Sequence, residues 1–415
     1  MLSPTIRAAC TIVSPNYLAF ARTVATSYLA MHPGHRFFVL LVADLDDATA
    51  FAGEHFTPVL LSQIGLETLR AEAMKYDILE LNTNVKPTLM KYLLAKYGLS
   101  ELVYLDPDIF VYSPFTSIFE ALETNDVALT PHLTAPVFDG KKPSEQDVLY
   151  NGTYNLGFIA VRNSPDARRM LDWWERRCLD LGFSEGRTGL FVDQKWINMV
   201  PGLFEHVRIL RHPGCNMAYW NLHERTLIET ADGYIVRGPE MSAPLCFFHF
   251  SGIVPADAAL LSRHTNRFTL ASRPDLAKLF ADYKAAVLAA KDARLEAIPY
   301  GFDTFSDGTT ITRLARRLYS AHLHLFPAGD PFDAKGSWAM YAKGAGLLAG
   351  KAPPAKATWN EFSHTDRRVT LLHRLFAMAL RALGPNRYEL LMRYLGHIAV
   401  LRNQATFLKP PARRP

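Results

Sequence analysis

Short runs of apolar residues alternate with longer segments of helical periodicity in the N-terminal part of the chain. The runs cover residues 8–13, 37–43, 102–105, 127–130 and 154–161, with a shorter one at 59–61. Between them, residues 17–30, 65–76 and 86–97 place apolar side chains at helical spacing. Strand-sized runs joined by helices are typical of α/β domains. We therefore predict an α/β fold with a mixed, mostly parallel sheet flanked by helices.

The pattern changes near residue 270, beyond which only helical periodicity remains. Amphipathic helices are predicted over residues 275–294, 310–325, 367–383 and 388–401, and the segment KAPPA at 351–355 has the composition of a linker or long turn. We therefore predict two parts, an α/β domain over residues 1–270 and a mostly helical C-terminal region over residues 271–415.

Composition is that of an ordinary globular protein, with 49% hydrophobic and 20% charged residues. The four cysteines (Cys10, Cys178, Cys215 and Cys246) are far apart in sequence and form no C-x-x-C pair. This spacing argues against a zinc cluster or a disulfide framework and fits a reducing compartment. The N-terminus lacks a signal-peptide pattern, and no run has the length of a membrane span. We expect a cytoplasmic protein.

Charge is distributed unevenly along the chain. Residues 367–415 contain ten Lys or Arg and one acid, Glu389, so this tail carries +9 while the remainder carries −4 of the total +5. A solvated helical face is one interpretation of the tail, and peripheral docking on an anionic membrane surface is a second. Nucleic-acid binding is not expected, because no nucleic-acid motif accompanies a slightly acidic core.

The chemistry of the chain centres on the sequence ELVYLDPDIFVYSPF at residues 101–115. Asp106 and Asp108 follow a buried strand, and burying carboxylates is costly unless a partner compensates them. Pro107 stiffens the turn and favours an extended conformation at Asp106, so both side chains can reach one point. Mg²⁺ and Mn²⁺ prefer carboxylate oxygens and leave room for phosphates. This pattern indicates either a D-x-D metal site or a turn with two solvated aspartates.

Five motifs in order resemble those of the GT-A glycosyltransferases, over roughly residues 8–265. They are IVSPNY at 12–17, YLDPD at 104–108, YNLG at 154–157, DQKWIN at 193–198 and HFSG at 249–252. The chain is most similar to the retaining, metal-dependent group of glycogenin and bacterial lipopolysaccharide galactosyltransferases. That resemblance implies transfer of a sugar from a nucleotide-diphosphate sugar, UDP-sugar being favoured, to a hydroxyl of a glycan, lipid-linked or lipopolysaccharide-type acceptor. It also strengthens the peripheral-membrane interpretation of the tail.

The resemblance assigns roles to individual residues. Asp106, Asp108 and His249 would bind Mn²⁺ or Mg²⁺. Asp193 and Gln194 would lie beneath the transferred sugar as the catalytic pair. The residues that would bind the donor are Ile12, Val13, Ser14, Tyr17, Lys86, Asn155 and Gly252. Two departures stand out: Ser14 or Pro15 replaces the family's aspartate at the first turn, and Ile253 follows HFSG where the family continues to a Lys-Pro.

Several of these positions have alternative interpretations. Asp193 has the sequence position of a helix N-cap. Lys86 is either a phosphate-binding point charge or a surface lysine, with Lys91 as a competing candidate. The loop NMAYWNLHER at 216–225 offers acceptor-binding side chains, namely Tyr219, Trp220, Asn221 and Arg225. The same loop also fits an aromatic cluster packed on the sheet.

Stereochemistry and reaction class also have rivals. The Asp-Gln pair and the His-x-x-Gly motif favour retention, whereas Glu224 would serve as general base in an inverting enzyme. A metal-dependent nucleotidyltransferase also needs paired carboxylates, but the chain shows no glycine-rich phosphate loop. A non-catalytic sugar- or lipid-binding scaffold is the third class, and the complete set of acidic and His residues argues against it.

Overall fold

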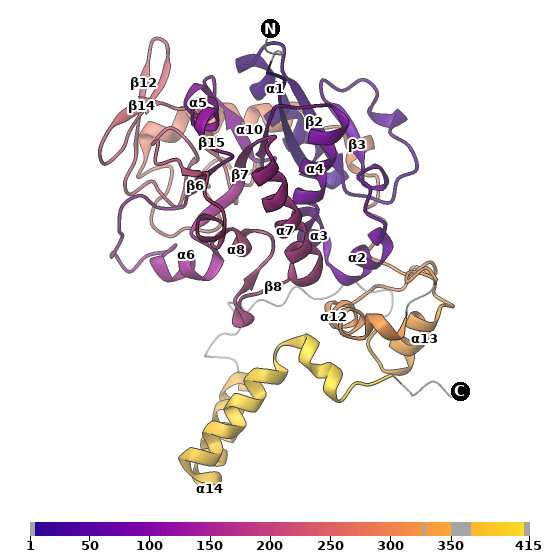
Figure 1. The fold of residues 1–415 in the computed structure, drawn as a ribbon. Coiled ribbons are helices and arrows are strands. Elements are labelled where there is room, and N and C mark those ends of the chain that lie inside the picture. The colour runs from indigo at the N-terminus through magenta and orange to yellow at the C-terminus, as the bar shows by residue number, and fades with distance from the viewer. Residues whose placement is uncertain (1–4, 327–328, 350–366, 411–415) are drawn as a thin grey trace. The chain divides into compact units, whose positions relative to one another are not determined.

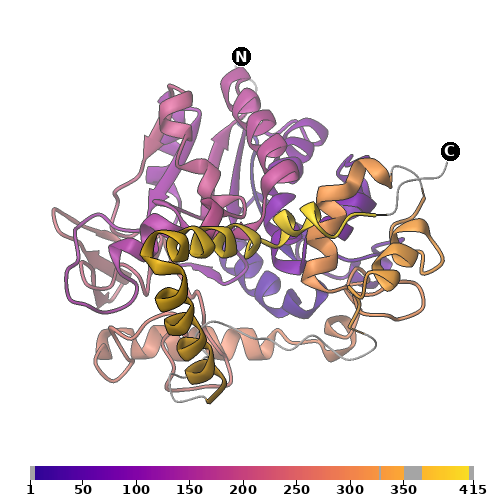
Figure 2. The same cartoon turned by 90° about the horizontal axis from the view of Figure 1, so that it is seen from below.

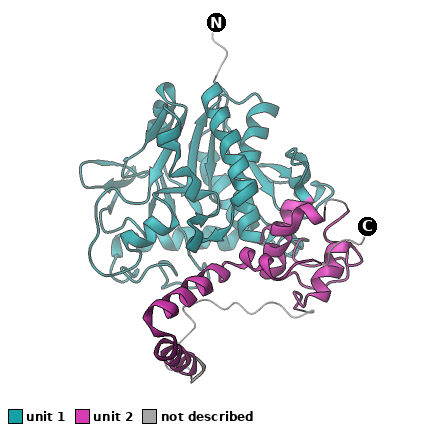
Figure 3. Cartoon of the chain, turned by 60° about the horizontal axis from the view of Figure 1, so that its bottom comes forward, with its two compact units in different colours: residues 1–69, 78–301 teal, residues 70–77, 302–415 magenta. Residues whose placement is uncertain are grey.

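The structure is a computed structural model that describes residues 5–326, 329–349 and 367–410. Contacts divide the chain into two compact units, coloured separately in Figure 3. Unit 1 contains residues 1–69 and 78–301, and unit 2 contains residues 70–77 and 302–415. The predicted linker at 351–355 lies outside the described residues.

A seven-stranded sheet forms the centre of unit 1 (Figure 1). Its order is β10-β6-β7-β4-β1-β2-β3, and β7 runs antiparallel to both of its neighbours, β4 and β6. The remaining pairs are parallel. The strands are β1 (Arg7–Val13), β2 (Arg36–Leu41), β3 (Thr57–Leu60), β4 (Glu101–Leu105), β6 (Val127–Pro131), β7 (Tyr154–Arg162) and β10 (Val207–Ile209). The predicted mixed, mostly parallel α/β sheet is confirmed.

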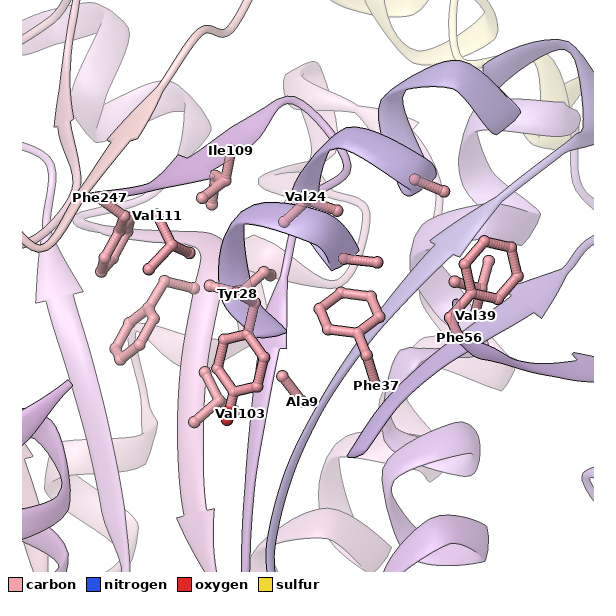
Figure 4. Close-up of a cluster of buried hydrophobic side chains, with 14 of the residues drawn as sticks. Ala9, Val24, Tyr28, Phe37, Val39, Phe56, Val103, Ile109, Val111 and Phe247 are labelled. Atoms are coloured by element: carbon pink, nitrogen blue, oxygen red, sulfur yellow. The ribbon is translucent and has the colours of Figure 1, made fainter. Parts of the chain in front are cut away.

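Both faces of this sheet are apolar, which explains why its strands are continuous hydrophobic runs. Side chains alternate between the faces of a strand. On one face, Ala9, Phe37 and Val103 pack against Val24 and Tyr28 of helix α1 (Leu18–Met31), as Figure 4 shows. On the other face lie the alternate residues, including Phe38 and Tyr104. Phe38 meets Tyr97 at the end of α4 (Lys86–Lys96), and the Lys86 ammonium lies over the Tyr104 ring.

Three smaller sheets extend unit 1. One has the order β11-β15-β5, with β11 at Met217–Ala218, β15 at Phe247–His249 and β5 at Ile109–Val111. A second is the meander β12 (Thr226–Thr230), β13 (Gly233–Arg237) and β14 (Ser242–Pro244), and the third pairs β8 (Ser184–Glu185) with β9 (Leu190–Phe191). The β5–β15 pair matters most for the site, because β5 follows the D-x-D turn directly.

The other helices of unit 1 are short or amphipathic. They are α3 (Ile78–Asn84), α5 (Thr116–Thr124), α6 (Glu145–Asn151), α7 (Pro165–Leu181), α8 (Gln194–Ile197), α9 (Val200–Leu203), α10 (Ala277–Ala289) and α11 (Ala293–Glu296). α7 begins at a Ser164 cap whose hydroxyl accepts from the Ala167 N–H, and it buries Trp174. α10 was expected in the C-terminal region. Its Phe280 and Tyr283 pack on Phe248 and Phe250 around β15, so it belongs to unit 1.

Unit 2 is helical, as expected for the C-terminal region. Its helices are α2 (Leu69–Lys75), α12 (Arg313–His322), α13 (Ser337–Gly344) and α14 (Arg367–Ile398). The first residue of α2, Leu69, is assigned to unit 1, and the rest of the helix to unit 2. Arg316 donates to the carbonyl oxygens of Ala73, Tyr76 and Phe302 at 2.7, 2.8 and 2.6 Å. Arg316 is therefore a packing residue that joins α2 and the segment at Phe302 to α12 within unit 2.

Helix α14 is interrupted at Gly384, which has φ of 74° and is followed by Pro385. Figure 2 shows the two limbs meeting at a sharp bend. Proline lacks a backbone N–H donor and glycine tolerates positive φ, so the Gly-Pro pair accounts for the interruption of the helix. Among the described residues, no helix has the length and apolarity needed to cross a membrane.

Candidate functional site

Asp106, Asp108 and His249 converge because β5 pairs with β15. In this register His249 lies opposite Ile109, the residue after Asp108. Its Nε2 is 2.9 Å from Oδ1 of Asp108 and 3.8 Å from Oδ2 of Asp106. The ligand atoms of the three side chains all lie within 4.8 Å of one another. The structure thus brings together the three residues expected to hold a metal.

Burial and the charges of neighbouring groups shift the pKa values of two of these three side chains, Asp106 and His249. Burial raises the pKa of Asp106, and the positive charges of Lys86 and His249 only partly offset this. Burial lowers the pKa of His249, but the carboxylates of Asp108 and Asp106 outweigh it and the net pKa lies above its usual value. Adjacent ligands of an octahedral ion at ~2.1 Å are about 3 Å apart. The 2.9 Å between His249 Nε2 and Asp108 Oδ1 is close to that spacing and is also the length of a hydrogen bond between the two groups.

Asn155 organises the neighbourhood of His249. Its Oδ1 accepts from Asn216 Nδ2 at 2.9 Å and lies 3.2 Å from His249 Nδ1. This contact fixes the ring, so that Nε2 faces the carboxylates. Gly157 is required here, because a Cβ at that position would lie 2.3 Å from Cε1 of His249. Asn155, expected as a donor contact, is thus also a positioning residue.

Lys86 and Asp193 form a buried ion pair. Lys86 Nζ lies 2.7 Å from Oδ2 of Asp193, and both side chains are 2% exposed. Lys86 also donates to the carbonyl oxygen of Leu156 at 2.7 Å. Burial raises the pKa of Asp193, and Lys86 opposes that shift. Lys86 is therefore not a surface lysine, whereas Lys91, its competitor, pairs with Asp172 and Glu175.

Asp193 occupies the N-cap position of α8, but its side chain makes no capping hydrogen bond. Its carboxylate faces Lys86 instead. The next residue, Gln194, accepts from the Leu156 N–H at 2.9 Å and donates to the Asn151 carbonyl oxygen at 3.1 Å. Both ends of this carboxamide are therefore fixed. The backbone of Gly157 connects the pair to the metal candidates, since its carbonyl accepts from the Asp106 N–H at 2.7 Å.

The first-strand motif lies at the carboxyl end of β1. Ile12 and Val13 are its last two residues, and the Ser14 hydroxyl donates to Asn16 Oδ1 at 2.8 Å. Tyr17 is exposed and stacks on Phe20 with ring centroids 5.2 Å apart. In the HFSG motif, Gly252 has φ of 75°, and a Cβ there would lie 2.5 Å from the His264 ring.

The loop at 216–225 mostly holds itself together. Asn221 is fully buried and donates to the Asn216 carbonyl oxygen at 2.9 Å, and Arg225 donates to the carbonyls of Pro213 and Cys215 at 2.9 Å each. Trp220 is buried edge-to-face against His249, with ring centroids 5.1 Å apart. Tyr219 is half-buried and packs against Trp220 and His264. In this structure the side chains of Asn221 and Arg225 therefore hold the loop in place, which agrees with the packing interpretation of the loop.

Glu224 is engaged by backbone. Its carboxylate accepts from the Thr134 N–H at 3.0 Å, from the Thr134 hydroxyl at 2.8 Å and from the Ala135 N–H. The Glu224 side chain is also only 1% exposed, so its carboxylate is engaged inside the protein and not open to an acceptor. Its role here is to hold the segment that follows β6.

Two further residues near the centre were not expected from the sequence. Asn216 is fully buried, has φ of 56°, and donates to Thr130 and Asn155 at 2.8 and 2.9 Å. His132 lies 3.3 Å from Asn155, and burial lowers its pKa to about 4. The only sequence signals were an asparagine in a Gly-Cys-Asn turn, where left-handed backbone is tolerated, and a histidine directly after a buried strand.

Comparisons with known proteins give partial similarity. No family model matches the chain. It is 32% identical to the uncharacterized protein YfnF of Bacillus subtilis (strain 168) over 170 residues, and 28% identical to YfnD of the same organism over 203 residues. These alignments cover 40% and 48% of this chain. The chain spans only 55% and 62% of the length of these two relatives.

Among solved structures, the chain is similar to the galactosyltransferase LgtC in complex with donor and acceptor sugar analogues. The TM-score is 0.39 at 17% identity, over 67% of this chain and 95% of that one. It is also similar to the glycosyltransferase GlyE of Streptococcus pneumoniae TIGR4, with a TM-score of 0.40 at 15% identity, over 76% of this chain and 73% of that one. Similarity at this level does not by itself assign an activity.

Proposed function

We propose that the chain is a metal-dependent glycosyltransferase that moves a sugar from a nucleotide-diphosphate sugar to a hydroxyl acceptor, with retention of anomeric configuration. One observation carries the proposal: Asp106, Asp108 and His249 lie together, and the Gly157 strand links them to Asp193 and Gln194. A carboxylate–imidazole set beside a buried acid–amide pair offers both a cation site and a polar surface for a sugar.

Asp106, Asp108 and His249 would hold Mn²⁺ or Mg²⁺. When bound, such an ion neutralises the negative charge of a leaving nucleoside diphosphate. Asn155 keeps the His249 ring in place, and Tyr104 donates to Oδ1 of Asp106 at 2.8 Å, which orients that carboxylate. The donor would also contact the backbone of two segments. One is the end of β1 and the turn that follows it, from Ile12 to Tyr17, and the other is Gly252.

Asp193 and Gln194 would lie next to the transferred sugar. Lys86 holds the carboxylate of Asp193 in one orientation, and the Leu156 and Asn151 backbone fixes the carboxamide of Gln194. Fixed dipoles stabilise charge that develops at an anomeric carbon without reorganising during the reaction. Retention is favoured because Glu224, the base expected for inversion, is occupied by backbone donors.

The acceptor is proposed to be a glycan or a lipid-linked sugar. Asn221 and Arg225 of the 216–225 loop donate to backbone within the protein, and Trp220 is buried against His249. Tyr219, which is half-buried, is therefore the residue of that loop proposed to stack on an acceptor sugar.

A panel of nucleotide sugars with Mn²⁺ tests the activity. We expect release of nucleoside diphosphate by the full chain, and loss of that release in excess chelator. Asp108→Asn should abolish it, whereas Asp282→Asn, a matched change at an exposed acid of α10, should not. Pyrophosphate release from a nucleoside triphosphate would instead indicate a nucleotidyltransferase, and full activity in chelator would reject the metal role.

The stereochemistry is tested on the product. With an α-linked gluco- or galacto-configured donor, we expect the small anomeric proton coupling of an α-linked product. Gln194→Ala should lower turnover more than donor affinity, because its contact matters most as charge develops. A large, diaxial coupling would establish inversion and contradict the assignment of Gln194.

We also propose that helix α14 docks on an anionic membrane surface, where a lipid-linked acceptor is found. Its exposed apolar side chains include Leu371, Leu372, Leu375, Met378, Leu380, Leu383, Leu390 and Tyr394. They share the helix with the arginines of the +9 tail. Apolar area combined with positive charge is the composition that binds anionic lipid.

Vesicle binding tests this docking. Neutralising Arg374 and Arg381 to Gln should weaken binding to anionic vesicles by roughly 30-fold, at ~1 kcal/mol per charge. The matched control replaces two exposed basic residues of unit 1, Arg169 and Lys278, with Gln. Equal weakening by both double variants, or equal binding of the native chain to neutral vesicles, would reject specific docking through α14.

A further inference from the structure

A second cluster of metal-ligating side chains lies outside the site described above. His212, Cys215 and Cys246 place their ligand atoms within 4.8 Å of one another. Nδ1 of His212 is 3.6 Å from Sγ of Cys215. Both cysteines are almost completely buried, and all four cysteines of the chain are free thiols.

The chemistry of this cluster differs from that of the D-x-D site. Thiolates and imidazole favour Zn²⁺ and Cu⁺, whereas carboxylates favour Mg²⁺ and Mn²⁺. Tetrahedral zinc has Zn–S near 2.3 Å and Zn–N near 2.0 Å, so its S and N ligands stand about 3.5 Å apart. The observed 3.6 Å between His212 and Cys215 matches that edge.

His212 of this cluster lines a cavity, whereas the two thiols are buried. A cavity of about 670 Å³ is lined by His212, by Ser117 and Glu120 of α5, by Arg208 of β10 and by Met241. A fourth ligand of an ion held by the three side chains would come from the His212 side, where this cavity lies. Three protein ligands with a fourth position open is a common zinc arrangement.

The two cysteines lie on separate segments that reach the candidate active site. Cys215 precedes Asn216, whose amide donates to Asn155. Cys246 leads into β15, which ends at His249, and its N–H donates to the Gly214 carbonyl at 2.8 Å. An ion bridging the two thiolates would link the segments that hold Asn155 and His249.

We propose that His212, Cys215 and Cys246 form a binding site for a soft transition-metal ion, with Zn²⁺ as its representative, separate from the D-x-D site. Binding converts the two thiols to thiolates and releases their two protons to solvent, so affinity should rise with pH. The proposal does not depend on glycosyl transfer, because it concerns metal binding alone. Sequence spacing argued against a zinc cluster, and the fold creates one by bringing distant residues together.

Cobalt substitution of the reduced, metal-free full chain tests the site. We expect one equivalent of Co²⁺ to give a thiolate-to-cobalt charge-transfer band that Zn²⁺ abolishes and Mg²⁺ does not. Asp108→Asn should retain the band, which separates this site from the D-x-D site. His212→Ala should weaken Zn²⁺ binding tenfold or more, since even second-shell changes cost 10–100-fold. Cys178→Ala, a buried cysteine outside the cluster, is the control.

Absence of the charge-transfer band in the native chain would overturn the proposal. So would equal Zn²⁺ affinity in His212→Ala, which replaces a half-buried residue and carries less risk to folding than a cysteine change. A Cys215–Cys246 disulfide in the freshly purified chain, seen as a mass lower by two hydrogens, would also overturn it in favour of a redox pair.

Discussion

The buried ion pair between Lys86 and Asp193 gives the sharpest quantitative prediction. Lys86→Met removes the ammonium and leaves a carboxylate that is 2% exposed without its cation. At 2.7 Å the attraction is about 6 kcal/mol with an effective dielectric constant near 20. Desolvation of both ions offsets much of this attraction. The loss of unfolding free energy in the variant therefore comes mainly from the buried Asp193 carboxylate that is left without a partner. We expect a loss of about 3–5 kcal/mol in unfolding free energy.

The pH dependence of this loss has a definite sign. Burial already raises the pKa of Asp193, and without Lys86 that pKa rises further. A carboxyl whose folded-state pKa exceeds its unfolded value destabilises the fold increasingly as pH rises above ~4, until it ionises in the folded state as well. The deficit of Lys86→Met relative to the native chain should therefore be smaller at about pH 5 than at about pH 8.

A double-mutant cycle isolates the pair. Lys86→Met combined with Asp193→Asn removes both charges and should recover most of the loss, because neutral replacements of buried pairs are well tolerated. The control is Lys278→Met, whose exposed pair with Asp282 at 3.3 Å is screened by water, so its loss should leave stability nearly unchanged. Urea unfolding followed by tryptophan fluorescence and circular dichroism measures the native chain, the single variants Lys86→Met and Asp193→Asn, their double variant and the control. A loss below ~1 kcal/mol in Lys86→Met, or no recovery in the double variant, would refute the reasoning.

Three further changes test the site and its surroundings. Asp108→Asn should leave the unfolding midpoint nearly unchanged while abolishing Mn²⁺-dependent turnover, and unchanged turnover would contradict a ligand role. Gly157→Ala should displace the His249 ring, costing about 1–3 kcal/mol and weakening Mn²⁺ binding, whereas Gly202→Ala, with nothing within 4 Å of its added Cβ, should do neither. His132→Gln should reduce the loss of unfolding free energy at acid pH. Burial lowers the pKa of His132 to about 4, so the native chain has its full stability from this residue above pH ~6.5 and loses up to roughly 3 kcal/mol as pH falls towards 4. An unchanged loss at acid pH in urea titrations would show that His132 takes up its proton freely.

The sheet and the D-x-D turn could be predicted because each follows from short stretches of sequence. His249 was expected beside the two aspartates only through the family resemblance, since the pairing of β5 with β15 brings it there. The strands that supply them are continuous apolar runs, and the D-x-D turn is stiffened by Pro107. The partners of Lys86 and Asn155 could not be predicted. Their contacts join residues far apart in sequence, and they depend on the register in which β7 pairs with β4.

The position of α10 shows a similar limit. The amphipathic pattern of α10 shows that one face is buried but not which surface buries it, and here the aromatic residues of β15 do so. The loop at 216–225 shows the same limit. Asn221 and Arg225 are residue types common in sugar sites, yet their side chains donate to the backbone carbonyls of Asn216 and Pro213.

Unit 2 contains a short piece from the N-terminal half of the chain, and this has a consequence for synthesis on the ribosome. Residues 70–77 offer their carbonyl oxygens to Arg316, about 240 residues later in the chain. At translation rates of ~5–20 residues per second, that arginine emerges roughly 12–50 s after the segment it binds. During this interval α2 has been synthesised but Arg316, which binds its carbonyl oxygens, has not. The strands of the central sheet are already available for pairing. A chaperone that recognises exposed helical segments would meet this one before any other part of unit 2.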